Sequence, residues 1–442
     1  MHAPSQAYTP PDPVELLQQL IRFDTTNPPG NEAECIQFIH QTLAQAGIEA
    51  QLYCLAASRP NLVARLPGEG KAPPLLLYGH VDVVTTAGQP WSVPPFEGRI
   101  QDGFIWGRVA LDMKGGVAML LSGFLRLVSM GQRPPGDVIF CAVADEENSA
   151  AFGARYLVEN QAHLFSGVKY ALSEFGGFSL EIGGKRFYPI MVGEKQLCKL
   201  KFTVRGPGGH GSMPVRGGAM RRMGELLRQM DRRRLPVRVT PPVRAMFEGM
   251  AAGLPAPMSW VFSSLLRPAL TDRLLDMLGE DARPFDPLLH NTACPTRLQA
   301  SEKDNVIPSQ VTLVADGRLL PGLKPEDMLA DLRPVIGPGV EVEVLGYEPG
   351  PPQADMGLFH SLAAILKQAD PQGLPSPYVM SGVSDARFFA RLGIQTYGFT
   401  PMKLPASFKF APLIHAADER IPVEALEFGS QAVYQALMAN HA

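Results

Sequence analysis

Long apolar segments are missing from this sequence, and cysteine is scarce in it. No stretch reaches the ~20 apolar residues that a membrane-spanning helix needs. The first residues, MHAPSQAYTPPDPVELL, lack a charged start followed by an apolar core, so we expect no export signal. The five cysteines are scattered and form no C-x-x-C pair, which argues against a disulfide framework and favours reduced thiols. We therefore expect a cytoplasmic protein without a membrane partner.

An excess of either charge is also missing. The 43 acidic and 40 basic residues leave a net charge of −3, which is too close to neutral to indicate binding to nucleic acid. What is present is the composition of an ordinary globular protein, 45% hydrophobic and 19% charged, in a chain of 442 residues. Because one hydrophobic core rarely organises so long a chain, two domains are expected.

The spacing of apolar residues divides the chain into an α/β part and an inserted part. In the first part, segments with helical spacing alternate with apolar strands, and the same alternation returns after Gly357. This alternation predicts a mostly parallel sheet covered on both faces. Between these parts, LCKLKFTVRG and VEVEVLG alternate as half-exposed strands do. We predict an α/β domain of residues 1–193 and 346–442, interrupted by an α+β domain of residues 194–345.

Side chains that can bind metals follow the apolar strands of the α/β part. They are one histidine and five carboxylates: His80, Asp82, Glu146, Glu147, Glu174 and, before a predicted helix, Asp112. Singly, each has an ordinary explanation, such as a helix N-cap for Asp112. Ligands of open parallel sheets, however, bind at the carboxyl ends of the strands, where so many carboxylates would repel one another. A divalent cation removes this repulsion, and two ions roughly 3.5–4 Å apart would use all the carboxylates.

Eight short motifs resemble, in the same order along the chain, those of the di-zinc aminoacylase and carboxypeptidase family: GHVDVV, ALDMKGG, ADEEN, LSE, GGHGSMP, NVIP, SDARFF and HAADERIPV. The family includes acetylornithine deacetylase, succinyl-diaminopimelate desuccinylase, aminoacylase-1, glutamate carboxypeptidase and carnosinase-like dipeptidases. The resemblance runs from residue 14 to the C-terminus. It implies a catalytic α/β domain of the zinc-peptidase type, an inserted lid domain through which relatives form homodimers, and a cis peptide bond between Asp112 and Met113.

Residue by residue, the resemblance implies two metal sites that share Asp112. His80 and Glu174 would complete one site, and Glu147 and His415 the other. Zinc accepts such nitrogen and oxygen ligands and leaves a position open for water in catalytic sites. The same ligands also serve cobalt or manganese.

The resemblance assigns further roles beside these ligands. Glu146 would be the general base, which takes a proton from water and returns it to the departing amine. Asp82 would orient His80 by accepting a hydrogen bond from its other imidazole nitrogen. His210, on the inserted domain, would bind the developing oxyanion.

Two positions resemble residues that hold the substrate. Arg387 and Asn305 would grip a carboxylate or a carbonyl group. The alternatives are a structural ion pair for Arg387 and a turn before Pro308 for Asn305. The sequence also departs from the family, because Val109 stands where many members have glycine and because the insert is long between Pro214 and Cys294.

The function that we predict is metal-dependent hydrolysis of an amide bond in an N-acyl amino acid or a small peptide, of the carboxypeptidase or dipeptidase kind. A biosynthetic deacylase of the acetylornithine or succinyl-diaminopimelate type is the alternative, and a metal-binding scaffold without turnover is an alternative from another class. Gly206, Gly208 and Gly211 also spell G-x-G-x-x-G. By itself this motif is a weak indication of a nicotinamide cofactor.

Overall fold

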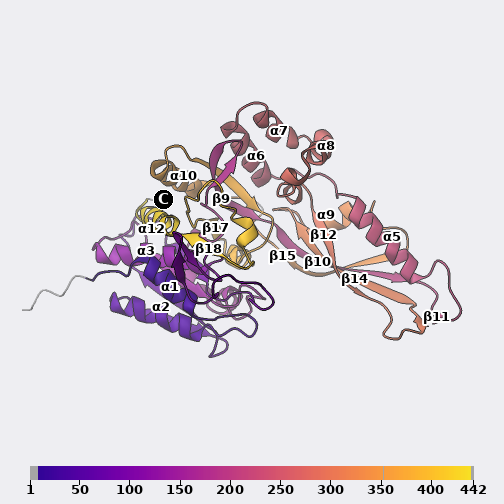
Figure 1. Cartoon of the computed structure of the whole chain (residues 1–442), viewed down its shortest axis with the longest axis horizontal. Coiled ribbons are helices and arrows are strands. Elements are labelled where there is room, and N and C mark those ends of the chain that lie inside the picture. Colours follow the sequence, from indigo (N-terminus) through magenta and orange to yellow (C-terminus); the bar gives the residue numbers. More distant parts are fainter. Residues whose placement is uncertain (1–7, 352, 440–442) are drawn as a thin grey trace, which may run out of the picture. The chain divides into compact units, whose positions relative to one another are not determined.

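Apolar runs of the first half of the chain form the centre of a nine-stranded sheet in the computed structural model, which describes residues 8–351 and 353–439 (Figure 1). The strands lie in the order β1 (Ala50–Cys54), β2 (Pro60–Leu66), β6 (Val138–Val143), β3 (Leu75–His80), β7 (Tyr170–Ser173), β17 (Gln395–Gly398), β9 (Lys185–Glu194) and β16 (Leu374–Met380), and β8 (Leu180–Ile182) pairs with β9. The neighbours β6, β3, β7 and β17 are parallel, whereas β1, β2 and β6 pair antiparallel. The predicted, mostly parallel sheet is confirmed.

Helices cover both faces of this sheet. As a result, β3 and β6 are buried at every position. On one face, Phe140 of β6 packs against Phe124 of α3 (Lys114–Ser129). On the other face, Tyr78 of β3 packs against Phe389 of α11 (Ala386–Phe389), which lies beside α4 (Ala154–Asn160). The remaining helices of this region are α1 (Pro13–Arg22), α2 (Ala33–Gln45), α10 (Gly357–Ala369) and α12 (Val423–Met438).

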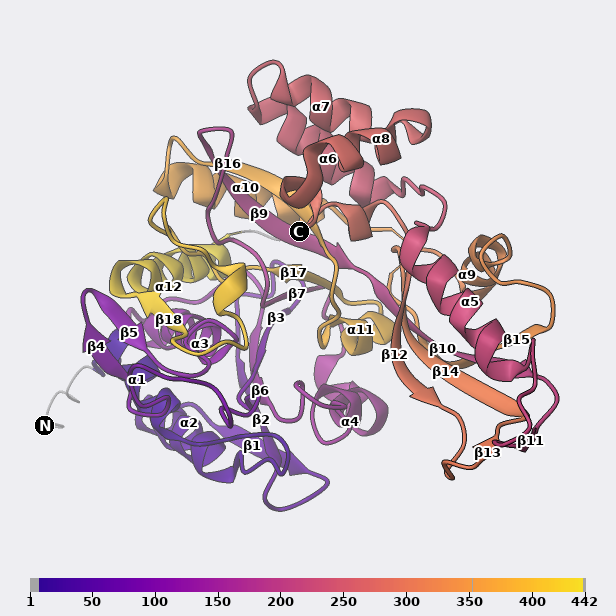
Figure 2. The same ribbon diagram turned by 45° about the vertical axis from the view of Figure 1, so that its right-hand side comes forward.

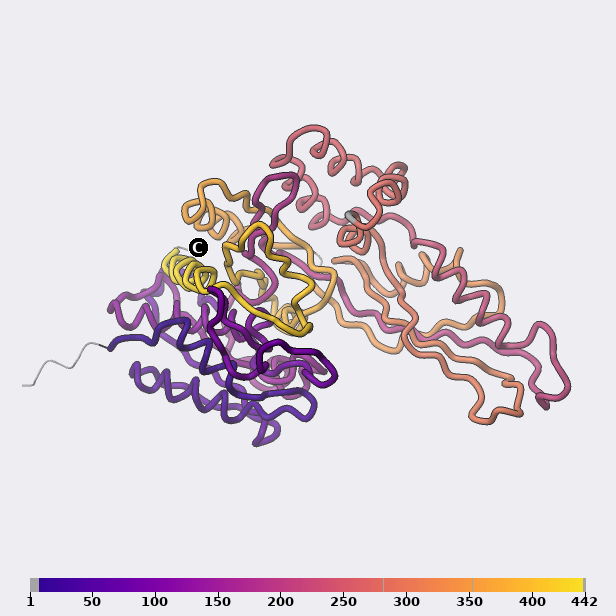
Figure 3. The backbone as a smooth tube through the Cα atoms, viewed as in Figure 1, coloured from indigo at the N-terminus to yellow at the C-terminus, as the bar shows by residue number. Residues whose placement is uncertain are grey.

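The last helix, α12, packs against the early helices α1 and α3. Figure 3 shows the yellow C-terminal segment beside the indigo and violet ones. Residues just before α3 and just before α12 also meet in a small antiparallel sheet of β18 (Arg420–Pro422), β5 (Phe104–Trp106) and β4 (Arg99–Gln101). Segments from both halves of the sequence therefore build one core.

A second sheet, antiparallel throughout, is formed by the inserted segment (Figure 2). Its order is β12 (Thr292–Gln299), β14 (Gln310–Leu319), β10 (Gln196–Arg205) and β15 (Val340–Glu348). Its apolar face packs against α5 (Ala219–Arg232) and α9 (Pro325–Leu332). The long stretch before β12 forms α6 (Pro241–Gly253), α7 (Met258–Leu265) and α8 (Pro268–Leu278), where Phe247, Phe262 and Phe285 contact one another.

Contacts along the chain define two units. The first comprises Met1–Val192, Asp355–Tyr378 and Ser384–Ala442, and the second comprises Gly193–Ala354 and Val379–Val383. The second unit continues beyond residue 345 because β15 pairs with β10 up to Glu348, which lies opposite Leu197. That the second unit is a lid or a dimerisation domain stays a prediction.

The cysteines and the helices bear on the expected cellular environment of the protein. All five cysteines are free. In the described part of the chain, no helix is both long and apolar enough to cross a membrane. The first seven residues of the segment that we examined for an export signal lie outside the described residues.

Candidate metal centre

Parallel strands bring four of the predicted side chains to one edge of the large sheet. His80 is the last residue of β3, Glu174 directly follows β7, and Glu146 and Glu147 follow β6 after a short turn. Since β6, β3 and β7 are parallel neighbours, these side chains leave the sheet at the same edge. This edge is the place where ligands of open α/β sheets bind.

Asp112 faces two histidines with its two carboxylate oxygens. Its Oδ1 lies 3.2 Å from His80 Nε2, and its Oδ2 lies 3.3 Å from His415 Nε2. His80 Nε2 is also 3.5 Å from Glu174 Oε2, and His415 Nε2 is 3.1 Å from Glu147 Oε1. The five side chains thus form two groups that share Asp112.

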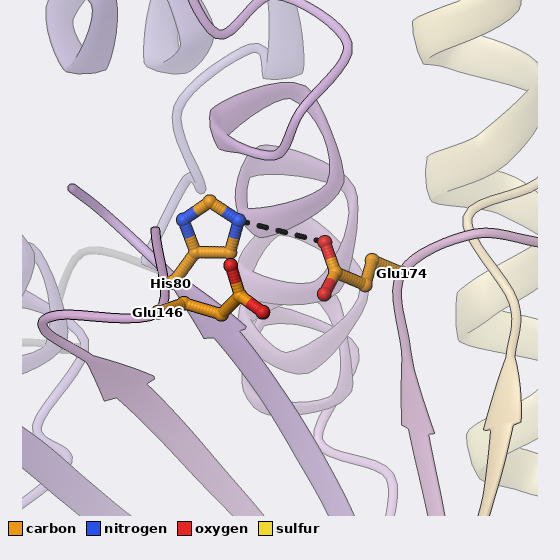
Figure 4. A group of neighbouring side chains, drawn as sticks. All are labelled: His80, Glu146 and Glu174. Carbon is orange, nitrogen blue, oxygen red and sulfur yellow. Dashed lines mark ion pairs between the residues drawn. The ribbon is translucent and has the colours of Figure 1, made fainter. Parts of the chain in front are cut away.

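Glu146 lies beside the first of these groups. Figure 4 shows its carboxylate next to His80 and Glu174. Ligand atoms of these three residues lie within 4.8 Å of one another, as do those of His80, Asp112 and Glu147. The geometry by itself is therefore compatible with Glu146 as a ligand or as a base.

The chemistry of these side chains fits divalent cations. Burial raises the pKa of Glu174 to about 8, and burial together with the charge of Glu174 raises the pKa of Glu146 well above its ordinary value. Hydrogen bonds to Asp112 and Glu147 raise the pKa of His415 to about 10. Glu174 Oε2 is buried, and its contact with His80 Nε2 is long, at 3.5 Å. Bound cations would take the place of these protons, and nitrogen and oxygen donors of this kind suit zinc and similar ions.

Asp82 differs in one contact from the prediction. His80 Nδ1 lies 3.0 Å from the backbone carbonyl oxygen of Asp82 but 3.6 Å from its carboxylate, beyond hydrogen-bond distance. The carboxylate instead accepts hydrogen bonds from the backbone N–H groups of Glu146 and Glu147, each at 3.1 Å. These N–H groups point to Asp82 because the chain turns sharply at Asp145, whose backbone is left-handed (φ 65°).

Asp145, the first of the three carboxylates after β6, is paired with other side chains of the protein. Arg59 contacts Glu32 at 2.6 Å and Asp145 at 3.0 Å, and all three side chains are buried. Asn27 donates hydrogen bonds to Asp145 and to Asp82, at 3.0 and 2.8 Å. Asp145 thus has a buried arginine and an amide as partners, whereas Glu147 contacts His415.

Left-handed backbone at non-glycine residues is concentrated around the centre. His415 (φ 59°), Phe175 (φ 58°) and Val109 (φ 71°) adopt it in addition to Asp145. Val109 is fully buried, and a branched residue in this conformation costs about 1–3 kcal/mol. The predicted cis peptide bond between Asp112 and Met113 is confirmed.

The predicted substrate residues belong to both units. In the second unit, β11 (Gly209–His210) pairs with β13 (Val306–Ile307), and the Gly211 N–H donates to the Asn305 carbonyl at 2.8 Å. This places His210, which is exposed, next to Asn305. In the first unit, Arg387 is 9% exposed and donates from Nη1 to the Ser384 carbonyl at 2.7 Å.

The glycine motif does not have the geometry of a dinucleotide site. That site needs a helix directly after the glycines. Here the chain passes from Gly211 through a turn, and over residues 206–219, all of which the structure describes, no helix begins before Ala219. The nicotinamide interpretation is therefore wrong.

Two histidine–carboxylate groups that share one aspartate at the edge of an α/β sheet define a class, the metal-dependent hydrolases with two-ion sites. The family model described as peptidase family M20/M25/M40 matches residues 76–439. The chain belongs to this family. It is an enzyme that hydrolyses amide bonds with the help of metal ions, which argues against the scaffold without turnover.

Known relatives carry several activities in their names. The chain is 28% identical to "Probable carboxypeptidase S-like 2" of Dictyostelium discoideum over 79% of this chain and 68% of that protein. It is 29% identical to N-fatty-acyl-amino acid synthase/hydrolase PM20D1 of Xenopus tropicalis over 80% and 70%, and 25% identical to succinyl-diaminopimelate desuccinylase of Halorhodospira halophila over 95% and 96%. Human carnosine dipeptidase 1 has a similar fold, with a TM-score of 0.67 at 16% identity over 96% and 95%.

We predict that Arg59 contributes much of the stability of this edge. Arg59→Met leaves Glu32 and Asp145 as unpaired buried carboxylates, so the free energy of unfolding should fall by about 3–5 kcal/mol. Arg65→Met is the matched control, because Arg65 lies on the adjacent strand and pairs with Asp137 at an exposed position. Its loss should cost less than about 1 kcal/mol. Denaturant unfolding of both variants measures the difference, and equal losses would contradict the role of the buried pair.

Proposed function

We propose that this enzyme is a two-metal hydrolase that cleaves the amide bond of N-acyl amino acids or of small peptides with a free carboxylate. One observation carries the proposal: Asp112 directs one oxygen to His80 and the other to His415. In this proposal His80 and Glu174 would hold one ion, Glu147 and His415 would hold the other, and Asp112 would contribute to both. The ions are zinc, with cobalt or manganese as the alternatives.

The residues of the chain would perform the proton transfers. Two ions, when bound, would lower the pKa of a water molecule and polarise the scissile carbonyl. Glu146 would accept the proton of the attacking water and donate it to the leaving amine. Its raised pKa suits this role, because the carboxyl group must hold the proton between the two steps. Asp82 would fix the turn that carries Glu146, through the backbone hydrogen bonds described above.

Residues outside the metal centre would bind the substrate. We assign His210 to the developing oxyanion, and Asn305 and Arg387 to a carbonyl or carboxylate of the substrate. The adjacency of His210 and Asn305 in the second unit supports a shared role. Because a guanidinium has several donors, Arg387 can bind a carboxylate while one Nη contacts Ser384.

Relatives support two substrate classes. Carboxypeptidase-like and N-acyl-amino-acid relatives favour an amino acid that carries a free carboxylate on the departing side. The desuccinylase relatives favour the second candidate, a biosynthetic deacylase. We further propose a cytoplasmic enzyme, since all five cysteines are free, and a homodimer formed through the inserted unit.

The substrate proposal predicts turnover of N-acyl amino acids or dipeptides. Metal-free protein supplied with zinc should hydrolyse members of a panel of N-acyl amino acids and dipeptides, and the matching substrates with an amidated carboxyl end should react far more slowly. Amine release measures the rates. Exclusive turnover of N-succinyl-diaminopimelate or acetylornithine would favour the deacylase, and no turnover of any amide would contradict the proposal.

Substitution of the adjacent glutamates separates ligand from base. Glu147→Gln replaces a charged ligand by a neutral amide and should release one ion. Glu146→Gln should keep both ions and lower kcat by about 10²–10⁴, because an amide cannot accept the proton of water. Elemental analysis and turnover of both variants provide the measurement. If Glu146→Gln loses an ion while Glu147→Gln keeps both, the two roles are reversed.

The oxyanion role of His210 predicts a change in rate without a change in metal content. His210→Ala should lower kcat by about 10²–10³, the usual effect of one oxyanion donor. His360→Ala, at an exposed position of α10, should leave kcat unchanged. Loss of metal from the His210 variant would contradict the assignment. If His210 acts in the site of a second copy, mixing the inactive His210→Ala and Glu146→Gln proteins should restore activity.

A further inference from the structure

A buried glutamate contacts the backbone of the segment that carries Asp112. Glu419 is 1% exposed, and its Oε1 accepts hydrogen bonds from the backbone N–H groups of Leu111 at 2.8 Å and of Asp112 at 3.2 Å. Asp112 lies in an irregular segment before α3, so no regular backbone ladder fixes it. Glu419 Oε1 therefore supplies the hydrogen-bond acceptor for two backbone N–H groups of this segment.

The other oxygen of Glu419 pairs with an arginine that contacts the second histidine segment. Arg108 Nη1 lies 3.0 Å from Glu419 Oε2 and donates to the carbonyl of Ala416, also at 3.0 Å. Arg108 Nη2 donates to the carbonyl of His415 at 3.4 Å. Arg108 is itself only 1% exposed. The pair thus contacts both the segment of Asp112 and the segment of His415.

Two more side chains complete this arrangement. Gln89 accepts a hydrogen bond from Arg108 and donates one to the His415 carbonyl at 2.9 Å. The Trp91 ring lies 5.0 Å from the guanidinium carbon of Arg108. His415 adopts a left-handed backbone, and three hydrogen bonds to its own carbonyl and to that of Ala416 hold the chain in this conformation.

Stability alone does not explain a buried ion pair at this place. Taking two charges out of water opposes folding, and apolar residues of similar volume often stabilise a protein as well or better. The location of the pair next to the proposed metal ligands does explain it. Loss of groups that orient metal ligands typically lowers metal affinity by about 10–100-fold. Asp112 belongs to both histidine–carboxylate groups, so a shift of its backbone alters both.

We infer that Arg108 and Glu419 form a positioning pair that holds Asp112 and His415 at the mutual distance required by the metal ions. This inference rests on the proposed function, because it requires that the two groups bind metal. Neither residue contacts the substrate in this scheme. The pair acts through the backbone of the two segments.

Zinc titration of three variants tests the inference. Glu419→Gln should lower the apparent zinc affinity about 10–100-fold and also lower the melting temperature, because the charge of Arg108 is left unpaired. The double variant Arg108→Met/Glu419→Leu removes both charges, so its melting temperature should recover. Its zinc affinity should stay low, because a leucine side chain cannot accept hydrogen bonds from the N–H groups of Leu111 and Asp112. Competition with a chromophoric chelator gives the affinity, and circular dichroism gives the melting temperature.

Asp370→Asn is the matched control for a destabilised protein. Asp370 is buried in the same unit and pairs with Arg186 at 2.9 Å, without contact to any proposed ligand. This variant should melt at a lower temperature and bind zinc as the unchanged protein does. Zinc affinity that recovers together with the melting temperature in the double variant, or that is unchanged in Glu419→Gln, would overturn the inference. Failure of the unchanged protein to bind two zinc ions would instead overturn the proposed function.

Discussion

Negative charge that is kept from water at one edge of a sheet is the constraint on which the rest of this structure depends. Carboxylates gathered there repel one another and resist burial, so each requires a positive partner. Asp145 and Glu32 have Arg59, and Glu419 has Arg108. Within the described part of the chain, Asp112, Glu147 and Glu174 contact the two histidines, and Glu146 lies beside them. The carboxylates that we propose to meet the metal ions thus outnumber the two histidines beside them.

The fold creates this edge by simple means. The carboxyl ends of neighbouring parallel strands lie at the same edge of the sheet. The helices cover the two faces of the sheet and leave this edge open to ligands. Sharp turns with left-handed backbone then direct neighbouring residues to opposite sides, as Asp145 and Glu146 illustrate. In this way one short acidic run contributes both to the structural network and to the candidate metal centre.

The sheet and the candidate metal ligands were predicted from two different kinds of sequence signal. The strand of residues 138–143 was evident because a central strand must be apolar throughout. The two groups around Asp112 were assigned from motif resemblance, since nothing local indicates that residues 112 and 415 meet. Arg59, Asn27 and the Arg108–Glu419 pair were missed. A single arginine before a strand is usually a surface residue. That Arg59 is buried follows from its contacts with carboxylates far away in the sequence, which the sequence alone does not indicate.

The end of the second unit shows another limit of sequence reasoning. Alternation predicted a strand over residues 340–346 and placed the end of the inserted domain at residue 345. The strand continues to Glu348 because backbone pairing with β10, which does not depend on the side chains, extends further.

The late position of His415 affects how the protein matures. Chains are made from the N-terminus onward, and domains fold as units. The large sheet lacks β17, and the helical layer lacks α12, until residues far beyond the inserted unit have been synthesised. A partly made chain therefore carries the acidic edge without its second histidine and without Glu419. On the proposed mechanism, the enzyme cannot act on peptides around the ribosome while it is still being made, and its activity begins only when both halves of the sequence have joined.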